Sequence, residues 1–416
     1  MKKIPEMIAA LVLCVCFVLL CGIAGAEEIH VLGSGNWDDL DYQFTLPDGR
    51  ILLTGAKEKD DSDDLEAWVL CLNPDRTVSW EYLDRERDGY TWARLAAMMP
   101  DGTIAVEFEN IQLTDRQNGI TVRFFTQDGQ LTGKEVPFSL DYIPFRATPN
   151  WLMLYRWKEG DVDETLLTDW DGNELLRYDG LIMPGAYGFT VENTEELVLF
   201  GHDTLEDSHA KIMKLDGLTD NVLWETTLEW QLPDTVEARF DGGIKTEDGG
   251  YAVLLEEGDA NTDAVPYVWR DFLVKVDAEG RVQWINRESF ERDNLSVRGM
   301  FSHNGKIVVY CGQVRGSDED PAQPWVFRWF DEDGKEIGTT EIKLNAEDFS
   351  VMSQYLEPEE EGVRREPVIS FAEEIPMGDE LWALGVCYAN EWNGDEETGT
   401  CVESRELVLV RLPELE

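Results

Sequence analysis

A degenerate repeat with a period of roughly 45 to 55 residues runs through almost the whole chain. In its clearest copy, residues 247–255 contain an Asp-Gly turn and a short apolar run, residues 271–277 contain a second run, and residues 278–284 contain a polar turn that leads to Trp284. Short runs of β-branched and aromatic residues separated by Asp-Gly turns are typical of antiparallel strands joined by tight hairpins. Four such strands in each repeat predict a β-propeller, in which every four-stranded blade packs against the next.

The number of copies predicts the number of blades. Each copy has an apolar run that we assign to its second strand, at residues 51–53, 104–106, 151–155, 197–200, 251–255, 306–310 and 381–386. The last copy reaches Pro413 without a fourth run, whereas residues 28–33 form an extra run before the first copy. We therefore predict an all-β protein with a single seven-bladed propeller of four-stranded antiparallel blades, whose ring is closed by the N-terminal strand. Six or eight blades are the alternatives. The acidic, proline-containing segment at about residues 355–367 is expected to be an insertion in the last blade.

Residues 247–284 carry a family resemblance. The Asp-Gly-Gly-Tyr start at 248–251, the strand at 273–277 and the finish at 280–284 resemble the repeats of bacterial extracellular propellers related to the PQQ-like and delta-60 repeat families. This resemblance implies a propeller fold and an exported protein, but no activity. The quinoprotein dehydrogenases that resemble this repeat have eight blades, with cofactor and metal ligands that we cannot match in this sequence. We therefore expect no quinone cofactor.

The N-terminus has the features of an export signal. Lys2 and Lys3 precede an apolar run at residues 7–23, and the small residues Ala24-Gly25-Ala26 follow it. This order predicts a signal peptide over residues 1–26 and a mature propeller domain over residues 27–416, secreted or held at the cell envelope. Two alternatives stay open: an uncleaved membrane anchor formed by residues 7–26, and a lipoprotein attached through Cys21.

Four cysteines remain in the mature chain. Cys387 ends one strand-like run and Cys401 opens the next, so an antiparallel pairing of these runs could bring the two within range of a disulfide. Cys71 and Cys311 lie inside apolar runs and are predicted to be small buried side chains.

The charge of the chain excludes one class of partner. With 35 Lys and Arg against 85 Asp and Glu, the formal net charge is -50, and no basic stripe exists that could neutralise phosphates. We expect no nucleic-acid binding, and we expect cationic partners or divalent ions to be favoured. The expected partner is a protein, peptide or glycan ligand, and the expected oligomeric state is a monomer.

No catalytic signature is recognisable. The four histidines, His30, His202, His209 and His303, match no metal-ligand spacing, and neither a Gly-x-Ser-x-Gly elbow nor a His-Glu-x-x-His motif is present. We therefore assign no catalytic residue and no cofactor-binding residue.

Calcium is the one cofactor for which the sequence offers candidates. Oxygen-bearing side chains alternate at Asp169, Asp171 and Asn173, with Gly172 at the turn, as in loops that hold a hard cation. The segment lacks the distal glutamate of an EF-hand loop, so a solvated hairpin turn is the alternative.

The tryptophans fall into two groups. Trp80, Trp224 and Trp284 recur at one position of the repeat, which predicts packing between blades. Others lie elsewhere and could serve as platforms for sugars or peptides, although core packing is the alternative for each: Trp37, Trp92, Trp157, Trp170, Trp230, Trp269 and Trp392.

These features predict an exported, non-enzymatic propeller that binds or scaffolds a protein, peptide or glycan at the cell envelope through loops on one face. The alternative is a carbohydrate-active hydrolase or lyase with paired carboxylates at the mouth of the central channel. That alternative would place a pocket at the starts of the inner strands, where most residues are apolar: Phe44, Arg94, Phe145, Phe189, Phe240, Met300 and Phe371.

Overall fold

The computed structural model describes residues 29–32, 38–59, 64–85, 90–111, 119–138, 142–158, 161–179, 196–202, 209–216, 221–229, 235–259, 269–287, 295–313, 325–342, 363–377, 380–393, 400–412 and 415. These residues form strands and turns, so the described part of the chain is all-β, as the sequence predicts. Within these ranges, no helix is long and apolar enough to cross a membrane. The predicted signal peptide, Phe189, Trp37 and Trp230 lie outside the described residues.

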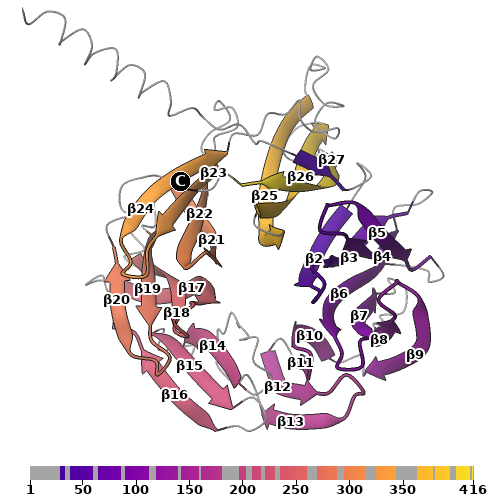
Figure 1. Ribbon diagram of the computed structural model, residues 1–416, viewed down its shortest axis with the longest axis horizontal. Coiled ribbons are helices and arrows are strands. Elements are labelled where there is room, and N and C mark those ends of the chain that lie inside the picture. Colours follow the sequence, from indigo (N-terminus) through magenta and orange to yellow (C-terminus); the bar gives the residue numbers. More distant parts are fainter. Residues whose placement is uncertain are drawn as a thin grey trace, which may run out of the picture.

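The described strands form seven antiparallel sheets arranged around a common axis in the manner of a β-propeller (Figure 1). In order along the chain, the sheets contain β2 (Asp38–Thr45), β3 (Ile51–Glu58), β4 (Leu65–Leu72) and β5 (Val78–Leu83); β6 (Tyr90–Met98), β7 (Ile104–Ile111), β8 (Gly119–Phe125) and β9 (Leu131–Phe138); β10 (Tyr142–Ala147), β11 (Leu152–Lys158), β12 (Asp161–Thr168) and β13 (Glu174–Asp179); β14 (Glu196–His202), β15 (Ala210–Asp216) and β16 (Val222–Thr227); β17 (Thr235–Lys245), β18 (Tyr251–Asp259), β19 (Trp269–Val276) and β20 (Val282–Asn286); β21 (Leu295–His303), β22 (Lys306–Gln313), β23 (Trp325–Phe330) and β24 (Glu336–Ile342); and β1 (Ile29–Val31), β25 (Val363–Met377), β26 (Glu380–Asn393) and β27 (Thr400–Arg411).

The last sheet combines strands from both ends of the described chain. Its order is β1-β27-β26-β25, and Ile29 lies opposite Val410. The sequence predicts this pairing from the unpartnered run at residues 28–33. Strand β25 begins at Val363, so its first residues fall inside the segment at 355–367 that we expected to be an insertion.

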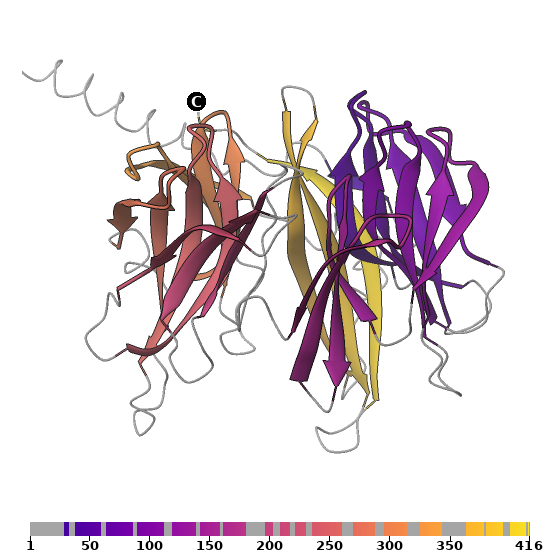
Figure 2. The same cartoon turned by 90° about the horizontal axis from the view of Figure 1, so that it is seen from below.

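In the five sheets that are built from four consecutive strands, tight turns join the first strand to the second and the third to the fourth. In the β2–β3 turn, the Gly49 amide donates a hydrogen bond to the Leu46 carbonyl over 2.9 Å, and Gly49 has a φ of +83°, a conformation that favours glycine. Because successive strands are antiparallel, these turns all lie at one end of the sheets, which we call the turn face (Figure 2). The connections between second and third strands leave from the opposite face.

The core is divided among clusters that each join two neighbouring sheets. Leu52 and Phe108 belong to a cluster between the first and second sheets. The same holds for each following pair of sheets. Leu53 and Trp382 belong to a cluster between the first and last sheets. Burial of apolar side chains therefore stabilises the packing of each of these pairs of sheets.

The strand register corrects the expected disulfide. Cys387 lies opposite Glu406, and Cys401 lies opposite Trp392, so the two cysteines are five positions apart along the β26–β27 pair. At about 3.3 Å per residue this offset is far longer than the Cα separation of a disulfide. The predicted pairing of the runs around Cys387 and Cys401 is therefore wrong. Cys71 and Cys311 are buried free thiols, as predicted, and burial raises the pKa of Cys71 to about 11.

Candidate functional site

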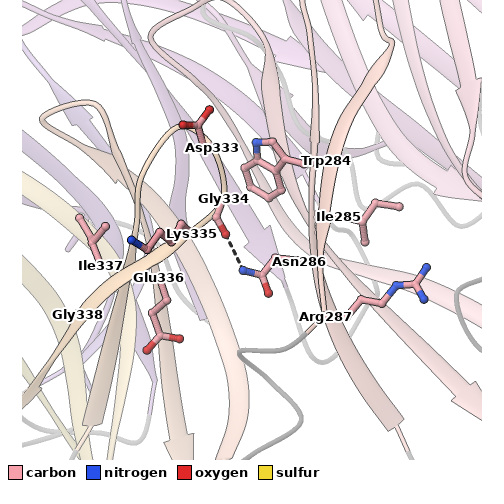
Figure 3. Close-up of a pocket in the computed structure, with 10 residues that line it drawn as sticks. All are labelled: Trp284, Ile285, Asn286, Arg287, Asp333, Gly334, Lys335, Glu336, Ile337 and Gly338. Carbon is pink, nitrogen blue, oxygen red and sulfur yellow. Dashed lines mark hydrogen bonds between the residues drawn. The ribbon is translucent and has the colours of Figure 1, made fainter.

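A groove of about 700 Å³ lies on the outer rim, between the outermost strands of two neighbouring sheets (Figure 3). One wall is β20, with Trp284, Ile285, Asn286 and Arg287. The other wall is the β23–β24 turn and the start of β24, residues 333–338. The volume falls within the range of about 300 to 1,000 Å³ that is typical of ligand pockets.

The edge of β20 forms much of one wall. Neighbouring side chains of a strand point to opposite faces. Figure 3 accordingly shows Trp284 and Asn286 on one side of β20 and Ile285 and Arg287 on the other. Ile285 packs against the core cluster shared with the preceding sheet. All four consecutive residues, 284–287, nevertheless line the groove. The backbone edge of the strand must therefore face the groove.

Side chains of β20 hold the two walls in place. The Trp284 indole donates a hydrogen bond from Nε1 to the Glu332 carbonyl over 2.8 Å, and Asn286 donates one from Nδ2 to the Gly334 carbonyl over 2.6 Å. Gly334 has a φ of +75°, and a Cβ at this position would lie only 2.6 Å from Trp284 Cδ2. A glycine is therefore required where the indole packs under the turn.

The same contact recurs in other sheets. Trp80 donates to the Gln127 carbonyl, and Trp224 donates to the Ala278 carbonyl, each over 3.0 Å. Each indole lies against the turn glycine of the next sheet, Gly129 or Gly280. The prediction that these tryptophans and Trp284 pack between blades is confirmed.

Charges of both signs surround the groove. Arg287 and Lys335 contribute cations, and Asp333 and Glu336 contribute carboxylates. This local balance contrasts with the net charge of -50 of the whole chain. The groove therefore offers polar groups and strand edges rather than a single field of negative charge.

The calcium candidates lie in the β12–β13 turn. Asp169 Oδ1 accepts hydrogen bonds from the amides of Asp171 and Asn173, and Asp169 Oδ2 accepts one from Asn173 Nδ2. Asp171 forms an ion pair with Lys134 of the preceding sheet. The described ranges contain no cluster of three or more His, Cys, Asp or Glu side chains placed to share a metal ion. In this arrangement the oxygens of Asp169 stabilise a turn, and calcium binding here stays a prediction.

Equivalent turns elsewhere use an aspartate in the same way. Asp277 Oδ1 accepts from the Arg281 amide over 2.9 Å, and Asp331 Oδ1 accepts from the Lys335 amide over 2.8 Å. The oxygen-bearing side chains at residues 169–173 therefore follow the sequence pattern of a hairpin turn that recurs in this protein.

The remaining histidine and tryptophan candidates do not gather at one place in the described part of the chain. His30 lies on β1 and His303 at the end of β21, whereas His202 ends β14 and His209 directly precedes β15. Trp170 is buried and donates a hydrogen bond to the Thr148 carbonyl over 2.8 Å, so it packs in the core and is not a ligand platform. Trp92 is half-buried and stacks on Tyr90.

The carbohydrate-active alternative places a pocket at the starts of the inner strands, so the residues there are relevant to it. Phe240 and Met300 are buried, and Phe44 and Phe145 are half-buried. Arg94 forms an ion pair with Glu109, with Nε and Oε2 2.8 Å apart. A glycosidase general acid needs a raised pKa. Seven carboxyl groups of the described residues instead have a pKa below its ordinary value: Asp48, Asp75, Asp101, Glu164, Glu174, Asp248 and Asp277.

Asp248 shows why these carboxyl groups are ionised. Partial burial by itself raises its pKa, but hydrogen bonds from Lys275, from the Thr246 hydroxyl and from the Gly250 amide lower the pKa to about 2. The Lys275 side chain is 4% exposed, whereas that of Asp248 is 43% exposed. The pair therefore holds a buried ammonium at the turn face.

The Asp248–Lys275 pair gives a testable pH dependence. Because the pKa of Asp248 is lower in the folded protein than in the unfolded chain, its stabilisation is present above about pH 4 and is lost as the pH falls towards 2. We expect Asp248→Asn to lower the free energy of unfolding by about 1 kcal/mol at pH 6, a modest value because solvent screens the exposed carboxylate. Urea unfolding of both proteins should show this difference shrinking towards pH 2.5. A difference that stays constant with pH would contradict the assignment.

Sequence reasoning did not find the groove. It assigned Trp284 to packing, correctly, but gave Asn286, Arg287 and the start of β24 no role. The available signal was Ile337, an aliphatic residue that directly follows the start of an outermost strand and is 39% exposed.

Comparisons with known proteins find similarity only to solved structures of low sequence identity. No family model matches the chain, and no curated protein matches it. The β-propeller domain of the Trilobed protease from Pyrococcus furiosus, which has an open velcro topology, is 11% identical, with 87% of this chain and 95% of that chain covered and a TM-score of 0.49. A Pyrococcus horikoshii acylaminoacyl peptidase is 12% identical, with 85% and 57% covered and a TM-score of 0.43. A putative TolB from Agrobacterium tumefaciens is 13% identical, with 64% and 83% covered and a TM-score of 0.36. The resemblance to the PQQ-like and delta-60 families stays a prediction.

Proposed function

We propose that this chain is an exported, non-enzymatic β-propeller that serves as a binding or scaffold module for a protein, peptide or glycan at the cell envelope. The observation that carries this proposal is the groove between β20 and β24, which has the volume of a ligand pocket and walls fixed by hydrogen bonds. Export rests on the signal peptide predicted over residues 1–26.

We also propose that the seven sheets are the blades of a closed ring, completed by β1. Two observations support closure: the pairing of β1 with β27, and the cluster in which Leu53 and Trp382 join the first and last sheets. A closed ring of blades is a rigid scaffold, which suits a role in holding a ligand or a partner in a fixed orientation.

The test is a binding measurement with the mature protein and a matched pair of variants. Ile337 and Leu175 are both the second residue of an outermost strand, and both are 39% exposed. Ile337→Trp fills the groove, whereas Leu175→Trp adds the same bulk to a strand of another sheet. Immobilised protein is offered envelope proteins, peptides and polysaccharides at physiological salt, first with calcium and then with a chelator.

We expect a saturable ligand that the wild type and Leu175→Trp retain equally, and that Ile337→Trp retains at least tenfold more weakly. Retention of a polysaccharide with release of shortened chains would instead favour the carbohydrate-active enzyme. Equal retention by both variants would remove the groove from the proposal. The thermal unfolding midpoint, measured with calcium and with chelator, tests the calcium prediction at Asp169, Asp171 and Asn173 separately.

A further inference from the structure

We propose that Leu415 is a releasable clasp, which holds the last sheet against the sixth sheet, β21–β24, by packing on Gly338 of β24. This inference goes beyond the proposed function, because it requires neither a ligand nor export. Three features of the joint between these sheets lead to it: the residue at the tryptophan position of β24, the side chain that packs there, and the connection that carries this side chain.

The first feature is the residue at the tryptophan position of the repeat. In three sheets the register between the outermost strand and its neighbour shifts, and the residue just before the shift lies opposite a tryptophan: Cys71 opposite Trp80, Lys214 opposite Trp224, and Lys275 opposite Trp284. In the sixth sheet the equivalent residue is Trp329, and it lies opposite Gly338. This sheet therefore presents bare backbone at the position where the other three present an indole.

The second feature is the side chain that packs on Gly338. A Cβ at Gly338 would lie 2.6 Å from Leu415 Cδ1 and 3.1 Å from Cδ2. Leu415 is half-buried, and it packs against a core cluster that contains Trp329 of the sixth sheet and Leu381 of the last sheet. In other joints the large side chain is the tryptophan, and the glycine belongs to the turn of the next sheet, as in the contact of Trp284 with Gly334. The joint between the sixth and last sheets thus has the same kind of contact with the two sizes exchanged.

The third feature is the connection that carries Leu415. A turn glycine such as Gly280 lies inside a hairpin, where its amide donates a hydrogen bond to the Asp277 carbonyl over 2.9 Å. Leu415 follows β27, but the outermost strand of the last sheet is β1, which comes from the other end of the described chain. A leucine side chain also has no hydrogen-bond donor, unlike the indoles that donate to a turn carbonyl. The Leu415 contact can therefore open without breaking a hairpin or an indole hydrogen bond, which makes local release favourable at this joint.

The test is hydrogen exchange at the Leu412 amide, which donates to the Leu381 carbonyl over 2.9 Å and lies between β27 and the clasp. Leu415→Ala removes the side chain, and Gly338→Leu fills the place where it packs. We expect each substitution to raise the exchange rate of the Leu412 amide about tenfold or more, and to leave the Asp277 amide in the fifth sheet within about twofold of the wild type.

Two further variants make the test specific. Ile337 is the chain neighbour of Gly338 and is 39% exposed, so Ile337→Ala removes an aliphatic side chain beside the clasp and should leave Leu412 exchange unchanged. Leu415→Ala and Gly338→Leu break the same contact. Their combination should therefore raise the exchange rate no further than the more severe of the two single substitutions.

Three results would overturn the clasp. Leu412 exchange that stays at the wild-type rate in both single variants would show that Leu415 does not hold the joint. An equal acceleration at Asp277 would show that the substitutions act on global unfolding. A combined variant whose acceleration is the product of the two single effects would show that Leu415 and Gly338 act independently.

Discussion

Replacing Asp84 by asparagine is expected to lower the free energy of unfolding by about 3 to 5 kcal/mol, because it leaves the buried Arg123 guanidinium without its buried carboxylate partner. Asp84 directly follows β5, and Arg123 lies on β8 of the next sheet. Their side chains are 3% and 7% exposed, and Oδ2 and Nη1 are 3.1 Å apart. Burial by itself lowers the pKa of Arg123, but the Asp84 carboxylate and the Tyr82 hydroxyl raise it above its usual range. Urea unfolding at neutral pH measures the loss.

Glu135 provides the matched control for Asp84. Its Oε1 lies 3.0 Å from Arg123 Nε, so it forms an ion pair with the same guanidinium, but its side chain is 52% exposed. Glu135→Gln should therefore cost less than about 1 kcal/mol. Replacing both buried partners, with Asp84→Leu and Arg123→Met together, should recover most of the loss, since no buried charge of this pair is left uncompensated. Equal losses for Asp84→Asn and Glu135→Gln would show that burial does not set the strength of this pair.

Replacing Gly280 by alanine is expected to cost about 2 to 5 kcal/mol, the sum of backbone strain and a clash with an indole. Gly280 has a φ of +79°, which L residues rarely adopt, and a Cβ would lie 2.4 Å from Trp224 Cε3. The indole is also held by its hydrogen bond to Ala278, so it cannot move away without losing that contact. Chemical unfolding of the variant and the wild type gives the difference.

Gly133 separates the two contributions. It has a φ of +83°, but no atom lies within 4 Å of the position that a Cβ would take. Gly133→Ala should therefore pay the backbone strain alone, about 1 to 2 kcal/mol. If both substitutions cost the same, the packing of Trp224 under the turn contributes nothing, and the account of the recurring tryptophans would have to be abandoned.

Much of the fold could be predicted because its signals are local. An Asp-Gly pair specifies a tight turn, and the alternating apolar run beside it specifies a strand, so residues 47–53 or 247–255 indicate a hairpin without reference to the rest of the chain. Trp80, Trp224 and Trp284 were also predictable, because a repeat places equivalent residues at equivalent contacts.

The groove and the register of the last sheet could not be predicted in this way, because both depend on how distant segments pack. The wall residues Asn286 and Gly338 belong to different sheets, and nothing in their own sequence neighbourhood indicates that they share a cavity. Similarly, the alternation of residues in β26 and β27 allows several registers. The observed one places Cys387 and Cys401 five positions apart.

The pairing of Ile29 with Val410 has a consequence for the order of folding. The first described strand of the chain completes the last sheet, so this sheet cannot form until almost the entire polypeptide has been synthesised. Contacts between residues so far apart in sequence are slow to form, because the chain must close a very long loop before they stabilise it. The other sheets are built from strands that are consecutive in the chain, and they can form while synthesis continues. We therefore expect the joint between the first and last sheets to be the final step of folding, and a pulse of hydrogen exchange during refolding should find the amides of β27 protected last.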